Sequence, residues 1–428
     1  MELTEKQECA FNSIKEGKNV FLTGPAGSGK SFLLKYFIDW YKIEKETNNG
    51  KIYITSTTGL SALLIDGMTI NRYAGVGIGD KDCDFYYKKI NKLKNIKSRW
   101  KNTGVLIIDE ISMMDPDFFD KLEIISRKIR KNDKPFGGIQ IILSGDFLQL
   151  PPVKSDSFCF ESFSWDDIIN ETYYFDKIIR QNDLRLQNVL NNIRIGFVNN
   201  EVKELLNECL NKDLKLPPGM NATLLFSKKS MVIEYNNKKI NKLIDEEKLD
   251  HHIYHTEYNF NEHKDLPEDN IKYFKELLDS QYPVDDIVML SIHSQVMLTI
   301  NMPELGLANG SLGIIIDFTK DDNHYPIVEF LNNTKIIIKK HEYIIEEESI
   351  VKYQIPLILA WAITIHKAQG MSLEYVQTDI GSSIFEYGQA YVVLSRIKNI
   401  DGLSLNNIDY NKIKAHPKVL KYYDKLKI

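Results

Sequence analysis

One stretch of the sequence has the residue types and spacing of a phosphate-binding loop. Its eight residues, Gly24-Pro25-Ala26-Gly27-Ser28-Gly29-Lys30-Ser31, fit the pattern G-x-x-x-x-G-K-[S/T]. The glycines allow backbone N–H groups to converge on phosphate oxygens, and a following helix adds a favourable dipole. Lys30 is expected to reach the β- and γ-phosphates of ATP, and the Ser31 hydroxyl to help hold Mg²⁺. The alternative is a glycine-rich turn that binds no ligand.

The segments on either side supply the elements that such a loop requires. Residues 19–23 form a short β-branched and aromatic run that predicts a buried strand, and the apolar spacing of residues 32–38 predicts a helix. Earlier in the chain, Gln7 stands three residues after Thr4 at a predicted helix start. Gln7 either completes a capping box or reads the edge of an adenine beside the loop.

Two further apolar runs end in polar residues. Residues 105–108 run directly into Asp109 and Glu110, and residues 139–143 lead to Gln149. Such runs are typical of parallel strands that are covered on both faces. Asp109 is expected to hold Mg²⁺ and Glu110 to take a proton from the attacking water, unless the pair is only a solvated strand end. Gln149 could sense the γ-phosphate or merely stabilise a turn.

These strand ends together predict a RecA-like ATPase core, because ligands of open α/β sheets bind at the carboxyl ends of the strands. Two arginines, Arg180 and Arg396, could stabilise the charge of the transition state, or could form surface ion pairs of little energetic value. The hydroxyls of Thr57 and Thr58 suit either a single-strand backbone groove or ordinary loop chemistry.

Composition limits the class of protein. The 428 residues carry a formal net charge of −5, so any nucleic-acid site must be a local groove. The 4 cysteines are scattered, which favours a reducing, intracellular compartment over a disulfide framework. We find no stretch that is apolar enough to cross a membrane and no signal-peptide pattern. Residues 245–282 are polar and lysine-rich, and they predict a solvated or flexible stretch.

Taken in order, the motifs resemble those of the PIF (petite integration frequency) DNA helicases, the 5′-to-3′ branch of superfamily 1 that also contains RecD-like enzymes. The most specific match is Asp120–Phe147, with Pro-Phe-Gly-Gly-Ile-Gln in its middle. The other matching segments are Leu3–Gln7, Gly24–Ser31, Thr57–Gly75, Leu106–Met113, Leu143–Val153, Arg180-Gln181, Leu307–Gly313, Thr364–Gly370 and Tyr391–Arg396.

The resemblance implies an α/β fold with two RecA-like P-loop domains, residues 1–178 and 179–428. The first would carry a strand-separating wedge at about 76–101, and the second a small SH3-like β-barrel at about 314–352. It also implies an ATP-dependent DNA helicase of replication, repair or recombination that uses ATP and Mg²⁺. Such a helicase binds single-stranded and tailed duplex DNA, and we expect it to work as a monomer.

The same resemblance implies a role for each matching residue. Gln7 would contact adenine, the loop from Gly24 to Ser31 the phosphates, and Ser31 and Asp109 the Mg²⁺. The implied catalytic residues are Glu110, Gln149 as γ-phosphate sensor, and Arg180 and Arg396 as arginine fingers. The implied DNA-side residues are Thr57, Thr58, Asn71, Arg72, Phe147, His366 and Lys367.

The chain departs from the family pattern at two places. Asn71 stands where the family usually has His, which could alter a DNA contact. Ile292-His293-Ser294 stands where the family usually has Lys-Gly-Ala, so this turn is expected to differ. The alternatives are a translocase or RNA helicase of the same superfamily, a small-molecule P-loop kinase, and a non-catalytic DNA-binding module. Stimulation of ATP hydrolysis by nucleic acid would exclude the kinase.

Overall fold

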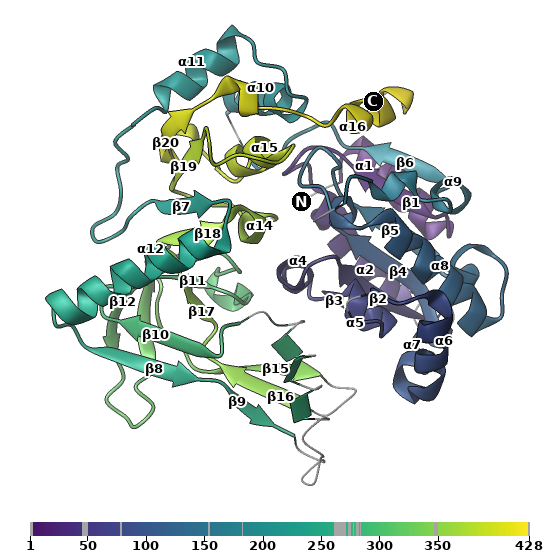
Figure 1. The fold of residues 1–428 in the computed structure, drawn as a ribbon, viewed down its shortest axis with the longest axis horizontal. Helices are drawn as coiled ribbons and strands as arrows, with labels where there is room; N and C mark the ends of the chain where they lie inside the picture. The colour runs from purple at the N-terminus through teal and green to yellow at the C-terminus, as the bar shows by residue number, and fades with distance from the viewer. Residues whose placement is uncertain are drawn as a thin grey trace. The chain divides into compact units, whose positions relative to one another are not determined.

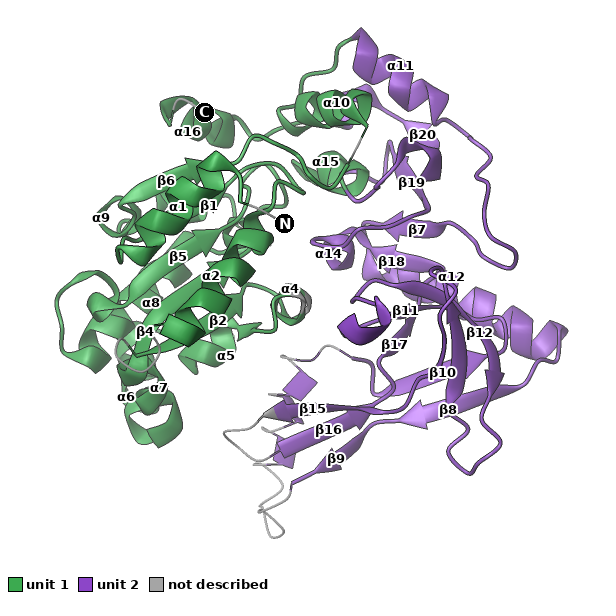
Figure 2. Cartoon of the chain, turned by 180° about the vertical axis from the view of Figure 1, so that it is seen from behind, with its two compact units in different colours: residues 1–199, 386–395, 413–428 green, residues 200–385, 396–412 purple. Residues whose placement is uncertain are grey.

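A computed structural model describes residues 3–44, 50–77, 79–152, 155–181, 183–260, 284–345 and 350–426, with isolated positions between 271 and 282. The chain forms two compact units (Figure 2). Unit 1 contains residues 1–199, 386–395 and 413–428, and unit 2 contains residues 200–385 and 396–412. Among the helices of the described ranges, none has both the length and the apolar character needed to span a membrane.

Unit 1 is built on a six-stranded sheet in the order β3-β2-β4-β5-β1-β6 (Figure 1). Every neighbouring pair in this sheet is parallel. The predicted strands at 19–23, 105–108 and 139–143 are confirmed, with small shifts at their ends. The strands are β1 (Val20–Thr23), β2 (Lys51–Ser56), β3 (Met68–Thr69), β4 (Thr103–Asp109), β5 (Gln140–Ser144) and β6 (Glu171–Tyr174).

Helices of unit 1 surround this sheet. They are α1 (Glu5–Lys15), α2 (Lys30–Glu44), α4 (Gly59–Leu64), α5 (Ile70–Ala74), α6 (Cys83–Lys92), α7 (Lys94–Asn102), α8 (Pro116–Arg130), α9 (Trp165–Ile168), α10 (Leu184–Arg194), α15 (Gln389–Leu394) and α16 (Pro417–Lys425). Short 3₁₀ turns follow β4 at Ile111–Met113 and occupy Pro135–Gly138 and Cys159–Glu161.

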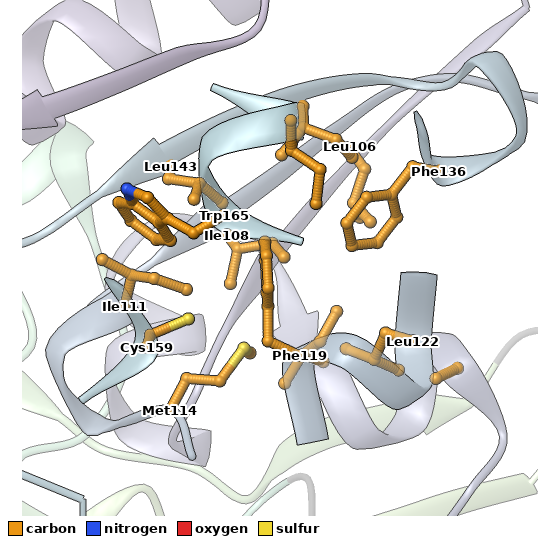
Figure 3. Close-up of a cluster of buried hydrophobic side chains, with 14 of the residues drawn as sticks. Leu106, Ile108, Ile111, Met114, Phe119, Leu122, Phe136, Leu143, Cys159 and Trp165 are labelled. Carbon is orange, nitrogen blue, oxygen red and sulfur yellow. The ribbon is translucent and has the colours of Figure 1, made fainter. Parts of the chain in front are cut away.

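The apolar strands serve two separate cores. Ile107 of β4 packs into a core with α1 and α2, whereas its neighbours Leu106 and Ile108 pack into a core with Phe119 of α8. Figure 3 shows this second core, in which Leu143 lies beside Trp165, and Leu106 lies beside Phe136. Because successive strand side chains point to opposite faces, both faces are buried and the run is apolar throughout.

The predicted insertion at 76–101 folds as the helices α6 and α7. Tyr86, Ile90 and Trp100 anchor these helices in the core shared with α8. The Arg130 guanidinium of α8 donates hydrogen bonds to the carbonyls of Trp100 at 2.7 Å and Gly137 at 2.7 Å. Arg130 therefore fastens the end of the insertion to the Pro-Phe-Gly-Gly turn.

Unit 2 contains a four-stranded sheet and several antiparallel sheets. The strands β18-β7-β19-β20 pair in parallel, and β14-β13-β12-β11-β17 form an antiparallel sheet. Smaller antiparallel groups are β15-β16-β9 and β10-β8. The dense short strands expected from residue 314 onward are present.

The strands of unit 2 are β7 (Thr223–Phe226), β8 (His251–His255), β9 (Glu257–Asn259), β10 (Ile287–Ser291), β11 (Gln295–Leu298), β12 (Leu312–Phe318), β13 (Pro326–Phe330), β14 (Lys335–Ile337), β15 (His341–Ile345), β16 (Ile350–Gln354), β17 (Leu357–Leu359), β18 (Ala362–Thr364), β19 (Val376–Ile380) and β20 (Leu403–Ile408). Its main helices are α11 (Asn200–Glu208), α12 (Lys229–Asn241) and α14 (Ile365–Ala368). A π-helical turn at Lys242–Glu246 extends α12, and short 3₁₀ turns lie at Pro303–Leu305, Ile400–Gly402 and Tyr410–Lys412.

Part of the stretch at 245–282, which was expected to be solvated or flexible, forms the strands β8 and β9, although most of their side chains are solvent-exposed. Tyr254 of β8 is buried opposite Val288 of β10, while His251 and His255 remain exposed. The strand is stabilised by a partner more than thirty residues away, so its own polar composition hides it. Residues 261–270 lie outside the described residues.

The division into units also differs from the expected boundary at residue 178. Residues 179–199 belong to unit 1, and so do the late segments 386–395 and 413–428 (Figure 2). The reason is long-range packing: α10 contacts α15, and Val419 and Tyr423 of α16 enter the core of unit 1. His293, between β10 and β11, adopts φ 66°, and the predicted difference of this turn from the family pattern stays a prediction.

Candidate functional site

Residues 24–29 connect β1 to α2 at the carboxyl edge of the unit 1 sheet. Gly24, Gly27 and Gly29 adopt φ values of 143°, 78° and 86°. A Cβ on Gly27 would lie 2.5 Å from Cβ of Arg180, and a Cβ on Gly29 would lie 2.6 Å from Nε2 of Gln7. Glycine is therefore required at these positions by both backbone conformation and close approach.

Lys30, the first residue of α2, turns back over the loop. Its ammonium donates to the carbonyls of Gly24 at 2.8 Å and Pro25 at 2.9 Å. Burial lowers the pKa of Lys30. The carboxylate of Asp146, followed by those of Glu110 and Asp109, opposes this shift in pKa.

The remaining loop residues suit a phosphate ligand. The Ser28 hydroxyl is buried and has no hydrogen-bond partner among the residues that the structure describes, whereas Ser31 is exposed at the start of α2. A buried hydroxyl of this kind is an available donor, and helix N-termini favour anions. The residues present therefore fit a nucleotide phosphate.

Gln7 completes the capping box and also contacts the phosphate-binding loop. Its side-chain oxygen accepts from the Thr4 backbone N–H at 3.0 Å, and the Thr4 hydroxyl accepts from the Gln7 N–H at 3.3 Å, which completes the capping box. The Gln7 amide nitrogen also donates to the Gly29 carbonyl at 3.3 Å. The helix cap thus holds the Gln7 amide against the loop. Its predicted contact with adenine stays a prediction.

Asp109 is the last residue of β4 and Glu110 follows it, next to the strand that leads to Thr57. Burial raises the pKa of Asp109, while the Ser144 hydroxyl and the Lys30 ammonium oppose that rise. Glu110 adopts a left-handed conformation with φ 53°, which is uncommon outside glycine and is a form of strain found at functional sites. The Thr57 hydroxyl donates to the Glu110 carbonyl at 3.0 Å and supports this turn.

Asp146 follows β5 and is fully buried against a residue that sequence reasoning missed. The Arg194 guanidinium donates to its two carboxylate oxygens at 2.8 and 2.9 Å. This pair lowers the pKa of Asp146, although burial alone would raise it. Tyr423 donates to the same carboxylate at 3.3 Å and shares a hydrogen bond with Thr23 at 2.7 Å.

Gln149 and Arg180 approach the same edge. Gln149 is buried, and its N–H donates to the Asp146 carbonyl at 2.9 Å. The backbone N–H groups of Ile179 and Arg180 donate to the Gly27 carbonyl at 2.8 and 3.3 Å. Burial lowers the pKa of the Arg180 guanidinium, which donates to the Ser395 carbonyl at 3.2 Å.

Tyr391 begins a segment that matches the family, but the sequence did not predict its contact with the loop. Its hydroxyl accepts the N–H of Ala26, inside the loop, at 2.8 Å. Sequence separations of 365 and 400 residues concealed the contacts of Tyr391 with Ala26 and of Tyr423 with Thr23. Arg396 belongs to unit 2, where it is buried and donates to the Met371 carbonyl at 3.5 Å. Its role as an arginine finger stays a prediction.

Two of the predicted DNA-side residues line one cavity of unit 1. Thr57 and Asn71 border a cavity of about 300 Å³ with Met113, Met114, Asp115 and Phe118 among its other lining residues. The Asn71 amide donates to the Gly77 carbonyl at 2.7 Å. Thr58 caps α4, and the Arg72 carbonyl accepts from Arg99 at 2.8 Å.

Phe147 corrects the prediction of a DNA contact, because its side chain is only 1% exposed. It packs in the core of unit 1 with Phe21 and Trp165 at ring-centroid distances of 5.4 and 5.8 Å. In unit 2, His366 is exposed and Lys367 is partly exposed on α14, where both side chains can be reached from solvent. Their predicted DNA contacts stay predictions.

The arrangement supplies the groups that phosphate transfer to water requires: a lysine at the phosphates, oxygen ligands for a hard cation, and a carboxylate base. Ser31 and Asp109 offer the hydroxyl and carboxylate oxygens that suit Mg²⁺, which would neutralise phosphate charge when bound.

The chain is similar to known proteins. Residues 2–204 match the family model described as PIF1-like helicase. ATP-dependent DNA helicase PIF1 of Xenopus laevis is 36% identical over 432 residues, which covers 99% of this chain and 64% of that relative. The chain thus spans a little under two thirds of the relative's length.

Solved structures agree along the whole chain. Pif1 helicase from Candida albicans is 34% identical with a TM-score of 0.79, covering 100% of this chain and 99% of that one. Pif1 helicase from Bacteroides in complex with ADP-AlF3 and ssDNA is 28% identical with a TM-score of 0.67, covering 100% and 97% of the two chains. At 34% identity to a Pif1 helicase that it covers almost completely, and with a match to the family model, the chain belongs to the PIF1-like helicase family.

Proposed function

We propose that this protein is an ATP-dependent DNA helicase that moves 5′ to 3′ along single-stranded DNA and unwinds duplex DNA. One observation carries the proposal: the loop at 24–31, Asp109-Glu110 and Gln149 all lie at the carboxyl edge of one parallel sheet. The relatives support it, since they are named ATP-dependent DNA helicases and one solved relative holds ADP-AlF3 together with ssDNA. The pathway we propose is replication, repair or recombination.

In this proposal each group at the edge has one task in ATP hydrolysis. Lys30 and the loop N–H groups bind the phosphates, and Gln7 contacts the adenine. Glu110 accepts a proton from the attacking water, and Gln149 orients the γ-phosphate region. Arg180 and Arg396 stabilise negative charge that develops in the transition state.

A hydrogen bond links the proposed DNA face to the hydrolytic turn. Thr57 lines the cavity beside Asn71, and its hydroxyl also donates a hydrogen bond to the carbonyl of Glu110. A DNA phosphate that drew the Thr57 hydroxyl away would therefore alter support of the strained Glu110 backbone. This gives a local physical route by which single-stranded DNA stimulates ATP hydrolysis. Thr58, Asn71, Arg72, His366 and Lys367 complete the proposed DNA contacts.

Finer features of the architecture belong to the same proposal. The helices α6 and α7 serve as the wedge region, and their lysines between residues 88 and 101 suit a nearby phosphate backbone. The strands between about 314 and 352 form the small SH3-like barrel. We further propose that the protein acts as a monomer in a reducing, intracellular compartment.

Unwinding assays on matched substrates test the proposal. A DNA duplex with a 5′ tail, one with a 3′ tail and an RNA duplex with a 5′ tail are incubated with the protein and Mg²⁺-ATP. We expect unwinding of the 5′-tailed DNA, with weaker binding as salt rises. Unwinding of RNA instead would favour the RNA helicase alternative, because the 2′-hydroxyl is what a site can discriminate. ATP hydrolysis stimulated by DNA without unwinding would favour a translocase.

A further inference from the structure

The Asp146 carboxylate is a negative charge close to the lysine that binds phosphate. It follows β5, whose partner β1 leads directly into the loop, and it is 0% exposed. Burial lowers the pKa of Lys30, and the Asp146 carboxylate opposes that shift. An unpaired carboxylate at this place would compete with nucleotide phosphates for the same ammonium, because charges interact strongly when water is excluded.

Groups other than Lys30 donate hydrogen bonds to the Asp146 carboxylate in the structure. Arg194 donates to both oxygens, at 2.9 Å from Nε and 2.8 Å from Nη2. Oδ1 also accepts from the Leu148 N–H at 3.2 Å and from the Tyr423 hydroxyl at 3.3 Å. The Lys30 ammonium instead donates hydrogen bonds to the loop carbonyls of Gly24 and Pro25.

Aromatic rings hold Arg194 in place. Its guanidinium carbon lies 5.6 Å from the ring centre of Tyr174 and 5.4 Å from that of Tyr423. Its Nη1 also donates to the Tyr174 hydroxyl at 3.2 Å. A planar guanidinium fixed by two rings and a bidentate carboxylate has little freedom to leave.

We propose that Arg194, with the help of Tyr423, is a positioning residue that keeps Asp146 from pairing with Lys30 and so leaves Lys30 available to the nucleotide phosphates. The inference rests on the proposed nucleotide role of Lys30 and goes beyond it, because it assigns the function of a residue outside the family motifs. Breaking a buried ion pair by removing one partner leaves an uncompensated charge, whereas removing both charges is often tolerated. The proposal therefore predicts rescue.

The experiment compares Arg194→Gln, Asp146→Asn, the double variant and Tyr423→Phe, with Arg185→Gln as the matched control on an exposed position of the same helix. The measurements are the dissociation constant of Mg²⁺-ATP without DNA, and KM and kcat of ATP hydrolysis with DNA. Melting curves identify a temperature at which every variant is folded.

We expect Arg194→Gln to weaken ATP binding roughly tenfold, and the double variant to return to within about threefold of the wild type. Tyr423→Phe should give a smaller loss in the same direction, and Arg185→Gln should leave binding unchanged. The inference is overturned if Arg194→Gln lowers only the melting temperature, or if the double variant binds ATP no better than Arg194→Gln. If DNA does not stimulate ATP hydrolysis by the wild type, the helicase proposal is refuted. The ATP-binding measurements without DNA would still test the positioning role of Arg194.

Discussion

Each unit contains a parallel strand that leads into a helix, and the two connections differ in length and residue type. In unit 1, residues 24–29 join β1 to α2 and include three glycines with positive φ. In unit 2, only Ser227 and Lys228 join β7 to α12, and neither is glycine. Both helices begin with a lysine, Lys30 and Lys229.

The difference shows what a strand-to-helix unit needs before it can bind phosphate. A lysine at the start of a helix and a helix dipole are present in both units. Only the longer connection has the glycines that let successive N–H groups face one ligand. Both units contain a parallel sheet, so the capacity to bind a nucleotide depends on the loops at the strand ends and not on the sheet itself.

The largest effect on ATP hydrolysis should come from comparing alanine substitutions of the two lysines, made one at a time. Lys30→Ala removes the charge that we propose contacts the β- and γ-phosphates, and we expect DNA-stimulated ATP hydrolysis to fall by about 100-fold or more. Lys229→Ala, at the same position of α12, should leave ATP hydrolysis at saturating DNA unchanged. Steady-state hydrolysis of both variants checks this contrast. Equal losses would show that the comparison between the connections is wrong.

Glu110→Gln separates chemistry from binding at the same edge. The amide cannot accept a proton from water, so we expect kcat for ATP hydrolysis to fall about 100-fold. ATP affinity, measured by equilibrium binding, should change little because the phosphate contacts remain. Asp117→Asn, in the first turn of α8, is the control. A glutamine variant that hydrolyses ATP at the normal rate would remove Glu110 from the base role.

Two glycines with similar backbone angles separate strain from close contact. Gly27 has φ 78° and a Cβ there would meet Arg180, whereas Gly17 has φ 85° and open space around it. Both alanine variants should lose about 1–2 kcal/mol of stability because alanine is strained at positive φ, and the clash with Arg180 should add to the loss in Gly27→Ala. Only Gly27→Ala should also weaken ATP binding, by about tenfold, since the contact displaces the loop or Arg180. Urea unfolding and ATP titration measure the two effects, and weaker ATP binding by Gly17→Ala would argue against a local cause.

The smallest effect concerns the opposite edge of the sheet, where β6 begins at Glu171. Hydrogen bonds from Lys18 and then from Tyr173 and Ser13 lower the pKa of Glu171 from 4.5 to about 2. Because the folded pKa lies below the unfolded one, this contribution to stability is present above pH 4.5 and is lost as pH falls toward 2. Glu171→Gln should therefore be slightly less stable than the wild type at pH 6, and the difference should shrink at pH 3.

The free energy of unfolding in urea at several pH values checks this prediction, and ATP hydrolysis near neutral pH should not change. Lys18 and Glu171 are partly exposed, so solvent screens the pair and the difference will be modest. A stability difference that grows as the pH falls would contradict the assignment. We would then no longer infer that the amino edge of the sheet contributes to stability while its carboxyl edge contributes to function.

Sequence reasoning recovered the parts of the site that are local. The loop at 24–31, Asp109-Glu110 and Gln149 each sit at the end of an apolar run, and turn residues at strand ends carry strong local signals. The alternation of side chains between two cores explains why these runs looked continuous. The polar residues that end these continuous apolar runs therefore predicted the edge of the sheet.

The rest could not be read because it depends on contacts across the chain. Nothing in the sequence around Arg194 distinguishes it from other helix residues, because its partner Asp146 lies 48 residues away along the chain. Tyr391 and Tyr423 contact Ala26 and Thr23, which lie 365 and 400 residues away along the chain. Phe147 was assigned by motif position, although its apolar ring gains more by packing in the core. β8 likewise exists because β10 pairs with it.

The return of residues 386–395 and 413–428 to unit 1 has a consequence for how the protein is made. During synthesis the loop at 24–31 leaves the ribosome early, but Tyr391 and Tyr423 follow only after unit 2 has been translated. The nucleotide pocket is therefore one of the last parts of unit 1 to mature. Until then Thr23 and the Ala26 N–H lack their late partners, and a nascent chain halted at residue 199 would present the complete motif without its complete support.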